Sequence, residues 1–289
     1  MGFYTTAILL GLGFVSLGLG MFLTLRIFNI PDITTDGSYT LGGAVTAVML
    51  VNNFQPLITL LVAMLSGAIA GTITGIIHTR LKVNALLAGI LVMTALYSVN
   101  LSIMGRSNIP LIQIQNIFSV LTFSNFEINN QIIIFCLFVI CLLFFITWIL
   151  KTDFGIAMRA TGNSESMVRA MGVNTQRMKI TGLAIANSLT ALSGFLITQY
   201  QGFADINMGI GIVISGLGAV IIGESLIKFL KSNKIFVQAL GVIAGTVLFR
   251  LILAVALSSG LNPNYLKLIT SIIVLLVVGI TRFAKEENK

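Results

Sequence analysis

Long apolar runs separated by short polar segments dominate the hydrophobic pattern of the chain. Most runs approach the ~20 residues that a helix needs to cross the hydrocarbon core of a bilayer. The pattern predicts an all-α, polytopic transmembrane helical bundle with about nine spans, and counts of eight to ten also fit. The whole chain, residues 1–289, is expected to form one membrane domain. The expected apolar elements cover residues 3–25, 39–51, 56–77, 84–104, 131–150, 180–200, 208–223, 236–257 and 265–282.

Two of these elements, residues 39–51 and 208–223, are short, and Pro31 prevents a continuous helix from the first run into the second. They are introduced by the similar sequences DGSYTLGGAV and DINMGIGIVISG, and each is followed by another run rich in small residues. The expected topology orients the two copies oppositely. This predicts inverted repeats with two broken or short helices that line a substrate path, although Gly-rich apolar sequences also align by chance.

The composition supports a membrane protein. Of the 289 residues, 56% are hydrophobic and 9% are charged, and the mean hydropathy is +1.02, so a soluble domain would expose large apolar areas. The net charge of +8 comes from Lys and Arg between apolar runs, which argues against nucleic-acid binding. Cys136, Cys141 and the single His78 form no disulfide or metal-ligand pattern.

The basic segments set the expected orientation. Positive residues concentrate on the cytoplasmic side of membrane proteins. Residues 80–82, 151–179, 228–234 and 282–289 all fit that side if the spans alternate. The chain is therefore expected to be a multi-pass protein of the plasma membrane, with its N-terminus outside and its C-terminus in the cytoplasm.

The longest polar segment, residues 151–179, is expected to be a cytoplasmic loop that contains a short helix. Asn163 or Ser164 can cap the start of this helix, and Gly172 can end it in a left-handed conformation. The helix would have about two turns.

Side chains on this helix suggest a contact with another protein. Glu165 and Arg169 have the spacing of four that pairs opposite charges on a helix. A small exposed apolar ridge that a soluble partner could grip is expected at Met167, Val168 and Met171. An ordinary helical turn in a loop explains the same pattern.

Polar groups at membrane depth are costly, so each suggests a pathway or a pair. The candidate pathway residues are Asp32, Thr34, Asp36, Tyr39, Asp205, Asn207 and Arg250, and further polar groups are Asn100, Asn187 and Gln199. Two interpretations of Arg250 stay open: it attracts an anionic group such as a carboxylate, or it pairs with Glu224 or Asp205. Asp32 and Asp36 can also simply cap the second helix.

No chemistry of an enzyme is visible in the sequence. A nucleophile with a base and an orienting group cannot be assembled, and no Walker-type phosphate loop is present. We therefore expect no catalytic residues, no metal ligands and no enzymatic activity on this chain.

Two motifs resemble a known family. The segment RATGNSESMVRAMGVNTQRMK, followed by a small-residue span with SGFL, is similar to the cytoplasmic coupling region of inner-membrane permeases of ABC importers. The resemblance is to importers of the branched-chain amino acid and ribose type and covers most of the chain. The segment NIPDITTDGSYTLGGAV resembles the subgroup described as tryptophan/tyrosine or uncharacterised amino-acid permeases.

The resemblance implies a homodimeric permease that imports a small solute, an amino acid and possibly an aromatic one, by alternating access. It implies no cofactor on this chain, ATP and Mg on a cytoplasmic ABC ATPase dimer, an extracellular substrate-binding lipoprotein and surrounding lipid. The residues implied in docking the ATPase are Arg159, Gly162, Asn163, Glu165, Met167, Val168, Arg169, Met171 and Gly172.

Other functions fit the residues as well. An ion-coupled secondary transporter would use Asp32, Asp36 or Asp205 as a proton or sodium site. Sugar and nucleoside permeases share the architecture that the resemblance implies, and an integral-membrane enzyme is the remaining class.

Overall fold

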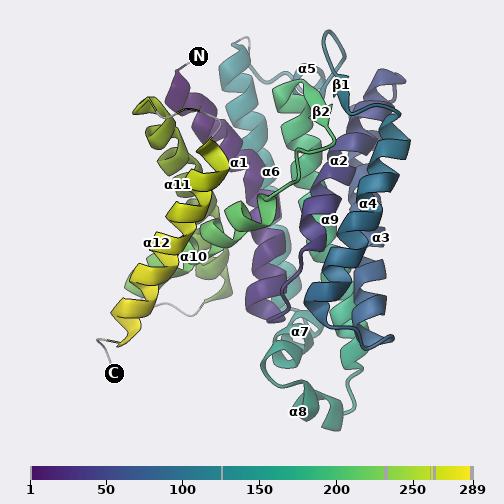
Figure 1. Cartoon of the computed structure of the whole chain (residues 1–289), viewed down its shortest axis with the longest axis vertical. Coiled ribbons are helices and arrows are strands. Elements are labelled where there is room, and N and C mark those ends of the chain that lie inside the picture. The colour runs from purple at the N-terminus through teal and green to yellow at the C-terminus, as the bar shows by residue number, and fades with distance from the viewer. Residues whose placement is uncertain (1, 125, 231–233, 261, 263–264, 287–289) are drawn as a thin grey trace.

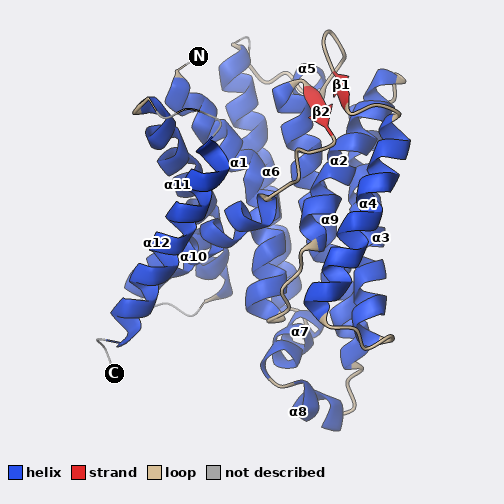
Figure 2. Cartoon of the chain, viewed as in Figure 1, coloured by secondary structure: helices blue, strands red, loops and turns tan. Residues whose placement is uncertain are grey.

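The computed structural model describes residues 2–124, 126–230, 234–260, 262 and 265–286, and most of them are helical (Figures 1 and 2). The first half contains α1 (Phe3–Phe22), a π-helical turn η1 (Leu23–Ile27), α2 (Thr34–Val51), α3 (Pro56–Thr79), α4 (Ala85–Met104), β1 (Asn108–Pro110), α5 (Ile117–Val120) and α6 (Glu127–Lys151). The second half contains α7 (Asp153–Asn163), α8 (Glu165–Ala170), α9 (Thr175–Gln201), β2 (Phe203–Asp205), α10 (Ile212–Leu230), α11 (Ile235–Ser258) and α12 (Leu266–Glu286).

The structure confirms a helical membrane bundle but does not confirm about nine spans. Within the described residues, six helices are long and apolar enough to cross a membrane: α1 with η1, α3, α4, α6, α9 and α11. The element expected at residues 39–51 is longer than predicted, because α2 begins at Thr34. Its first turns are polar, and they are buried among other helices rather than exposed to lipid. Polar first turns can be stable at membrane depth because neighbouring helices supply hydrogen-bond partners.

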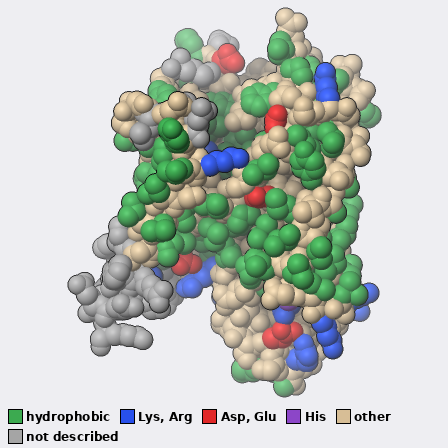
Figure 3. Space-filling model, in the orientation of Figure 1, with side chains coloured by type: hydrophobic (Ala, Val, Ile, Leu, Met, Phe, Trp, Pro, Cys, Tyr) green, Lys and Arg blue, Asp and Glu red, His purple; other side chains and the backbone are tan. Residues whose placement is uncertain are grey.

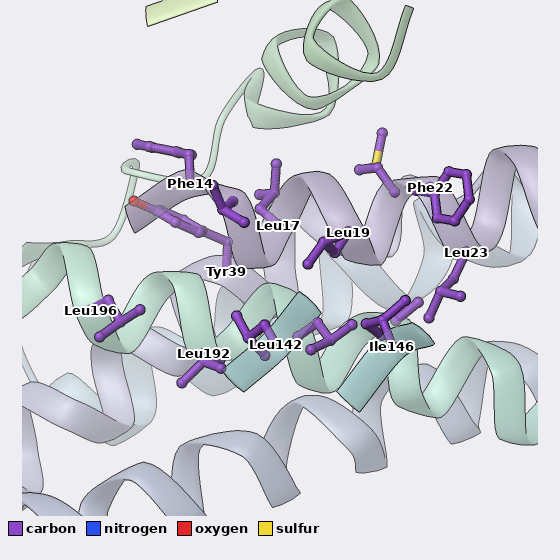
Figure 4. Packing of buried hydrophobic residues seen from close by; sticks show 14 of the residues in the cluster. Phe14, Leu17, Leu19, Phe22, Leu23, Tyr39, Leu142, Ile146, Leu192 and Leu196 are labelled. Atoms are coloured by element: carbon purple, nitrogen blue, oxygen red, sulfur yellow. The ribbon is translucent and has the colours of Figure 1, made fainter. Parts of the chain in front are cut away.

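The centre of the bundle is formed by α1, α2 and α9, whose residues are mostly buried. Their side chains, together with those of α6, meet in one apolar core, as Figure 4 shows around Phe14, Tyr39 and Leu192. By contrast, α3 and α4 keep one face of exposed Leu, Ile and Val residues, which suits contact with lipid.

The helices are paired as an inverted repeat would pair them. Helix α1 packs on α11 and on α9, while α9 packs on α3 and on α2. The two helices that follow an interruption, α2 and α10, run in opposite directions along the bundle (Figure 1). Helix α1, the first helix of one repeat, thus packs against α11, and α9, the first helix of the other repeat, packs against α3.

Small residues let α2 and α9 approach closely. A Cβ atom on Gly42 would collide with the carbonyl oxygen of Ala191, and one on Gly194 would collide with the carbonyl oxygen of Tyr39. Glycine at both positions therefore permits backbone-to-backbone contact, which favours helix association in a membrane.

The two ends of the bundle differ. Helices α7 and α8 project from one end, and α12 runs toward that same end, while β1 and β2 lie near the other (Figure 1). Lys and Arg side chains gather around the end that carries α7 and α8, below a largely apolar surface (Figure 3).

Candidate functional site

Asp32 belongs to a buried polar network at the start of α2. Its Oδ1 accepts a hydrogen bond from the Thr34 backbone N–H at 2.9 Å, and its Oδ2 accepts one from Asn187 Nδ2 of α9 at 2.7 Å. Asn187 Oδ1 in turn accepts the Ser38 hydroxyl at 2.7 Å. The Thr34 hydroxyl is hydrogen-bonded to the Thr74 hydroxyl of α3 at 2.8 Å. Asp32 thus caps α2, as one interpretation predicted, and also ties α2 to α9.

Asp36 has a different role from the expected cap of its own helix. Its Oδ2 accepts the Gly211 N–H at 2.9 Å and its Oδ1 accepts the Val213 N–H at 2.8 Å. The Val213 N–H belongs to the first turn of α10, which begins at Ile212, and the Gly211 N–H lies just before that turn. A carboxylate on the first interrupted helix therefore caps the second one, where both the free N–H groups and the helix dipole favour negative charge.

Arg250 of α11 lies over an aromatic pair. Its Cζ is 3.6 Å from the centroid of the Phe14 ring, and Phe14 stacks on Tyr39 with centroids 5.7 Å apart and an interplanar angle of 16°. A guanidinium over a ring face is stabilised by the ring quadrupole. The three side chains join α11, α1 and α2.

The predicted ion pair of Arg250 with Glu224 or Asp205 is wrong. Glu224 pairs with Arg26, whose Nε is 3.4 Å from the Glu224 Oε1. Asp205 accepts hydrogen bonds from the Asn207 N–H at 2.8 Å and from Asn108 Nδ2 at 3.2 Å. Across the described part of the chain, Arg250 has no carboxylate within ion-pair distance.

The candidate pathway residues therefore lie in three places. Asp32, Thr34 and Asp36 surround the start of α2, and Tyr39 joins Arg250 around Phe14. Asp205 lies on β2, which pairs antiparallel with β1, so it and Asn207 lie near the opposite end of the bundle from α8 (Figure 1).

The short helix predicted in the polar loop is present as α8. Ser164 stands at its N-cap, although its side chain makes no capping hydrogen bond, and Asn163 instead ends the preceding helix α7. Gly172 has a φ of 83°, so it ends the helix in the left-handed conformation that the sequence indicates.

Glu165 fastens α8 to the next helix. Its carboxylate accepts hydrogen bonds from Arg169 at 2.8 Å, from the Thr175 hydroxyl at 3.1 Å and from Lys179 Nζ at 2.5 Å. The hydrogen bond from Lys179 is the main reason why the pKa of the Glu165 carboxyl lies below its ordinary value. The predicted pair with Arg169 exists, but as one part of a network to α9.

The apolar ridge on α8 is narrower than predicted. Met167 is 65% exposed and Met171 is 73% exposed, whereas Val168 is 5% exposed. The prediction that Val168 belongs to the exposed ridge is therefore wrong, because this residue faces the body of the protein. The surface knob of α8 consists of Met167 and Met171.

Helix α7 connects this knob to the bundle core. Asn29 Nδ2 donates a hydrogen bond to the Gly162 carbonyl at 3.3 Å, and a Cβ atom on Gly162 would collide with the carbonyl oxygen of Ile27 at the end of η1. Arg159 of α7 keeps its Nε buried without a hydrogen-bond partner in the described residues. Gly162 thus packs against the π-helical turn η1 rather than lying on the exposed surface of α8.

Sequence reasoning missed two features of this site. Asn187 was recognised only as a polar group within a span, and its residue type alone gives no hint of a contact with Asp32, 155 positions away. The sequence also contains no indication of the π-helical turn η1 apart from Asn29 and Pro31, which follow it. Asn29 adopts a φ of 53°, a left-handed conformation that Asn tolerates.

Comparisons with known proteins identify the family of the chain. Residues 3–279 match the family model "Branched-chain amino acid transport system / permease component". The chain is 38% identical over 262 residues to a tyrosine transport system permease protein of Clostridioides difficile (strain R20291), covering 90% of this chain and 84% of that protein. It is 30% identical over 220 residues to a probable branched-chain amino acid transport permease protein of Methanocaldococcus jannaschii, covering 72% of this chain and 69% of that one.

A ribose import permease protein of Escherichia coli (strain K12) is 25% identical over 268 residues, covering 90% of this chain and 79% of that protein. No solved structure matches the chain significantly. The family match spans nearly the full bundle, including the interrupted helices, α7 and α8. The chain belongs to the family of branched-chain amino acid transport system permease components.

Proposed function

We propose that this chain is the permease subunit of an ABC importer that carries an amino acid, with aromatic amino acids as the first class to test. Two copies form the membrane channel of the plasma membrane, with the N-terminus outside. A cytoplasmic ABC ATPase dimer binds ATP and Mg and hydrolyses ATP, so this chain needs no cofactor or catalytic residue. An extracellular substrate-binding lipoprotein delivers the amino acid.

The observation that carries this proposal is the form of α8. A two-residue apolar knob, Met167 and Met171, protrudes into water at the basic end of the bundle. Exposed apolar side chains on a surface that is held rigidly favour a protein contact. The Glu165 network and the contact of Gly162 with η1 supply that rigidity at both ends of the knob.

The substrate class is supported by the relatives. The Clostridioides difficile relative is named a tyrosine transport system permease protein, and the Methanocaldococcus jannaschii relative is named for branched-chain amino acids. The ribose permease is less similar, at 25% identity. An amino acid is therefore the substrate that the resemblance favours.

The docking role is tested by adding charge to the knob. The variant with both Met167→Asp and Met171→Asp should insert in the membrane normally but lose copurification with the ATPase, since a charge inside an apolar contact is costly. Gln176→Asp is the matched control, because Gln176 is also exposed near this end. Full ATPase retention by the double variant would contradict the docking role of α8.

A second test separates an importer driven by ATP from a secondary transporter. Vesicles that contain the chain with its ATPase should accumulate tyrosine only when ATP is supplied on the ATPase side. Accumulation by the chain alone on a proton or sodium gradient would overturn the proposal.

A further inference from the structure

A small cavity lies beside the start of α2 and is separate from the α8 surface. It opens between α2, α4 and the segment that joins β2 to α10, and it has a volume of about 30 Å³. Its polar walls come from Asp36, Thr40, Tyr97 and Asn100, and Gly209 closes one side. Figure 1 shows this segment running down the bundle from β2 to the start of α10.

Asn100, one of the residues that line this cavity, carries an unused hydrogen-bond acceptor. The residue is 1% exposed, and its Nδ2 donates a hydrogen bond to the Gly37 carbonyl at 3.2 Å. Its Oδ1 has no hydrogen-bond partner anywhere in the described residues. An unpaired acceptor at this depth is unfavourable unless a ligand or water donates to it.

The other groups around the cavity also favour a donor with positive charge. The Asp36 carboxylate accepts the Gly211 N–H at Oδ2 and the Val213 N–H at Oδ1, and each carboxylate oxygen can accept more than one hydrogen bond. The Thr40 hydroxyl already donates to the Asp36 carbonyl, so it too can offer only lone pairs to the cavity. Tyr97 adds an aromatic ring, which attracts cations. Lys267 of α12 attracts Asp36 electrostatically but does not line the cavity.

The volume of the cavity further restricts which chemical group it can hold. A volume of this order holds about one water-sized group. A primary ammonium group has that size, carries one positive charge and has three donors. A carboxylate would be repelled by Asp36 and would leave Asn100 Oδ1 unpaired.

We propose that this cavity is an ammonium subsite, which holds the α-amino group of the transported amino acid while the rest of the molecule lies outside it toward Tyr97. This inference rests on the proposed function and names the part of the substrate that the chain recognises. Asn100 and Asp36 are its hydrogen-bond acceptors, and Gly209 allows its wall to lie close to α2, because a Cβ atom there would collide with the Asp36 carbonyl oxygen.

The test measures ligand binding to the full-length chain in nanodiscs, without any ATPase. The probes are L-tyrosine, tyramine, which lacks the carboxylate, and 3-(4-hydroxyphenyl)propionate, which lacks the amine. Tyrosine and tyramine should bind about tenfold or more tightly than the propionate, because hydrogen bonds to a charged group are lost with the amine. Equal binding of all three would overturn the proposal.

Variants of Asn100 locate the effect. Asn100→Leu should remove the preference for the amine-bearing probes. Asn100→Asp, which retains an acceptor oxygen, should keep that preference. Ser98→Ala, an exposed change on the same helix, is the control and should keep the preference. A preference that survives Asn100→Leu would overturn the assignment.

Sodium is the competing cation, and the assay distinguishes it. Binding is repeated with sodium replaced by N-methylglucamine. Unchanged binding of tyramine supports the ammonium subsite, whereas binding that depends on sodium would assign the cavity to a metal ion and overturn the proposal. Because no ATPase is present in this assay, a negative result here would refute the ammonium subsite without bearing on the ATP-driven uptake experiment.

Discussion

The contact between Asp36 and α10 can be tested by removing the carboxylate. Asp36→Ala deletes the acceptor of both the Gly211 and the Val213 N–H groups. A hydrogen bond to a charged group contributes about 1.5–3 kcal/mol, and the two bonds share one side chain and lie next to a cavity that water can enter. We therefore take about 3 kcal/mol for the loss of both rather than their full sum.

This free energy applies to the local opening of the first turn of α10. A loss of about 3 kcal/mol corresponds to roughly hundredfold faster hydrogen exchange at the two amides, since each 1.4 kcal/mol is a factor of ten. Asp36→Asn keeps one acceptor oxygen and should accelerate exchange about tenfold. The measurement is hydrogen–deuterium exchange with mass spectrometry on the chain in nanodiscs, followed over the peptide that contains residues 209–217.

Asp205→Ala provides the control for this experiment. Asp205 also accepts a local backbone N–H, that of Asn207, but it makes no hydrogen bond to α10. It should accelerate exchange at Asn207 and leave the Val213 amide unchanged. If Asp36→Ala changes exchange at Gly211 and Val213 by less than about threefold, the cap does not hold α10 and the reasoning is refuted.

Two further predictions concern the other polar contacts. The double-mutant cycle of Asp32→Ala and Asn187→Leu should give a coupling energy of about 1.5–3 kcal/mol in denaturation by SDS, because a carboxylate and a buried amide share one hydrogen bond. A coupling energy near zero would show that this hydrogen bond does not stabilise the protein. The pKa of Glu165 is lowered in the folded protein, so its stabilisation of α8 is present above the ordinary carboxyl value of 4.5 and is lost as the pH falls below it. The measurement is hydrogen exchange of α8 between pH 6 and pH 3, corrected for intrinsic exchange rates. Glu165→Gln should show fast exchange at both pH values. A wild-type chain whose exchange does not depend on pH would contradict the role of Glu165.

The sequence predicted features that depend on near neighbours in the chain. The apolar runs predicted the membrane helices. Ser164 as a helix-start signal and Gly172 as a helix-stop signal predicted α8 within a residue or two of its bounds. Polar residues before a short Gly-rich run also indicated that α2 and α10 are special, and both take part in the network around Asp36.

The errors came from contacts between distant segments. Val168 looks like its apolar neighbours in sequence, and only the packing of α8 against the bundle decides that it is buried. One of the two interpretations of Arg250 paired it with Glu224 or Asp205, but an aromatic ring from α1, more than 200 positions earlier, lies beside it instead. Likewise, the polar start of α2 made a count from hydropathy uncertain, because neighbouring helices rather than lipid surround it.

The packing of the first helix against helices near the end of the chain has a consequence for how the protein is synthesised. Helix α1 leaves the ribosome first, yet it packs on α9 and α11, and α11 is completed only after residue 258 has been synthesised. Until then Gly11 and Gly18 of α1, which lie against α11, lack their native neighbours. Native assembly of this permease must therefore be a late event, and a chain truncated before α11 should be a substrate for membrane proteases rather than a stable half-transporter.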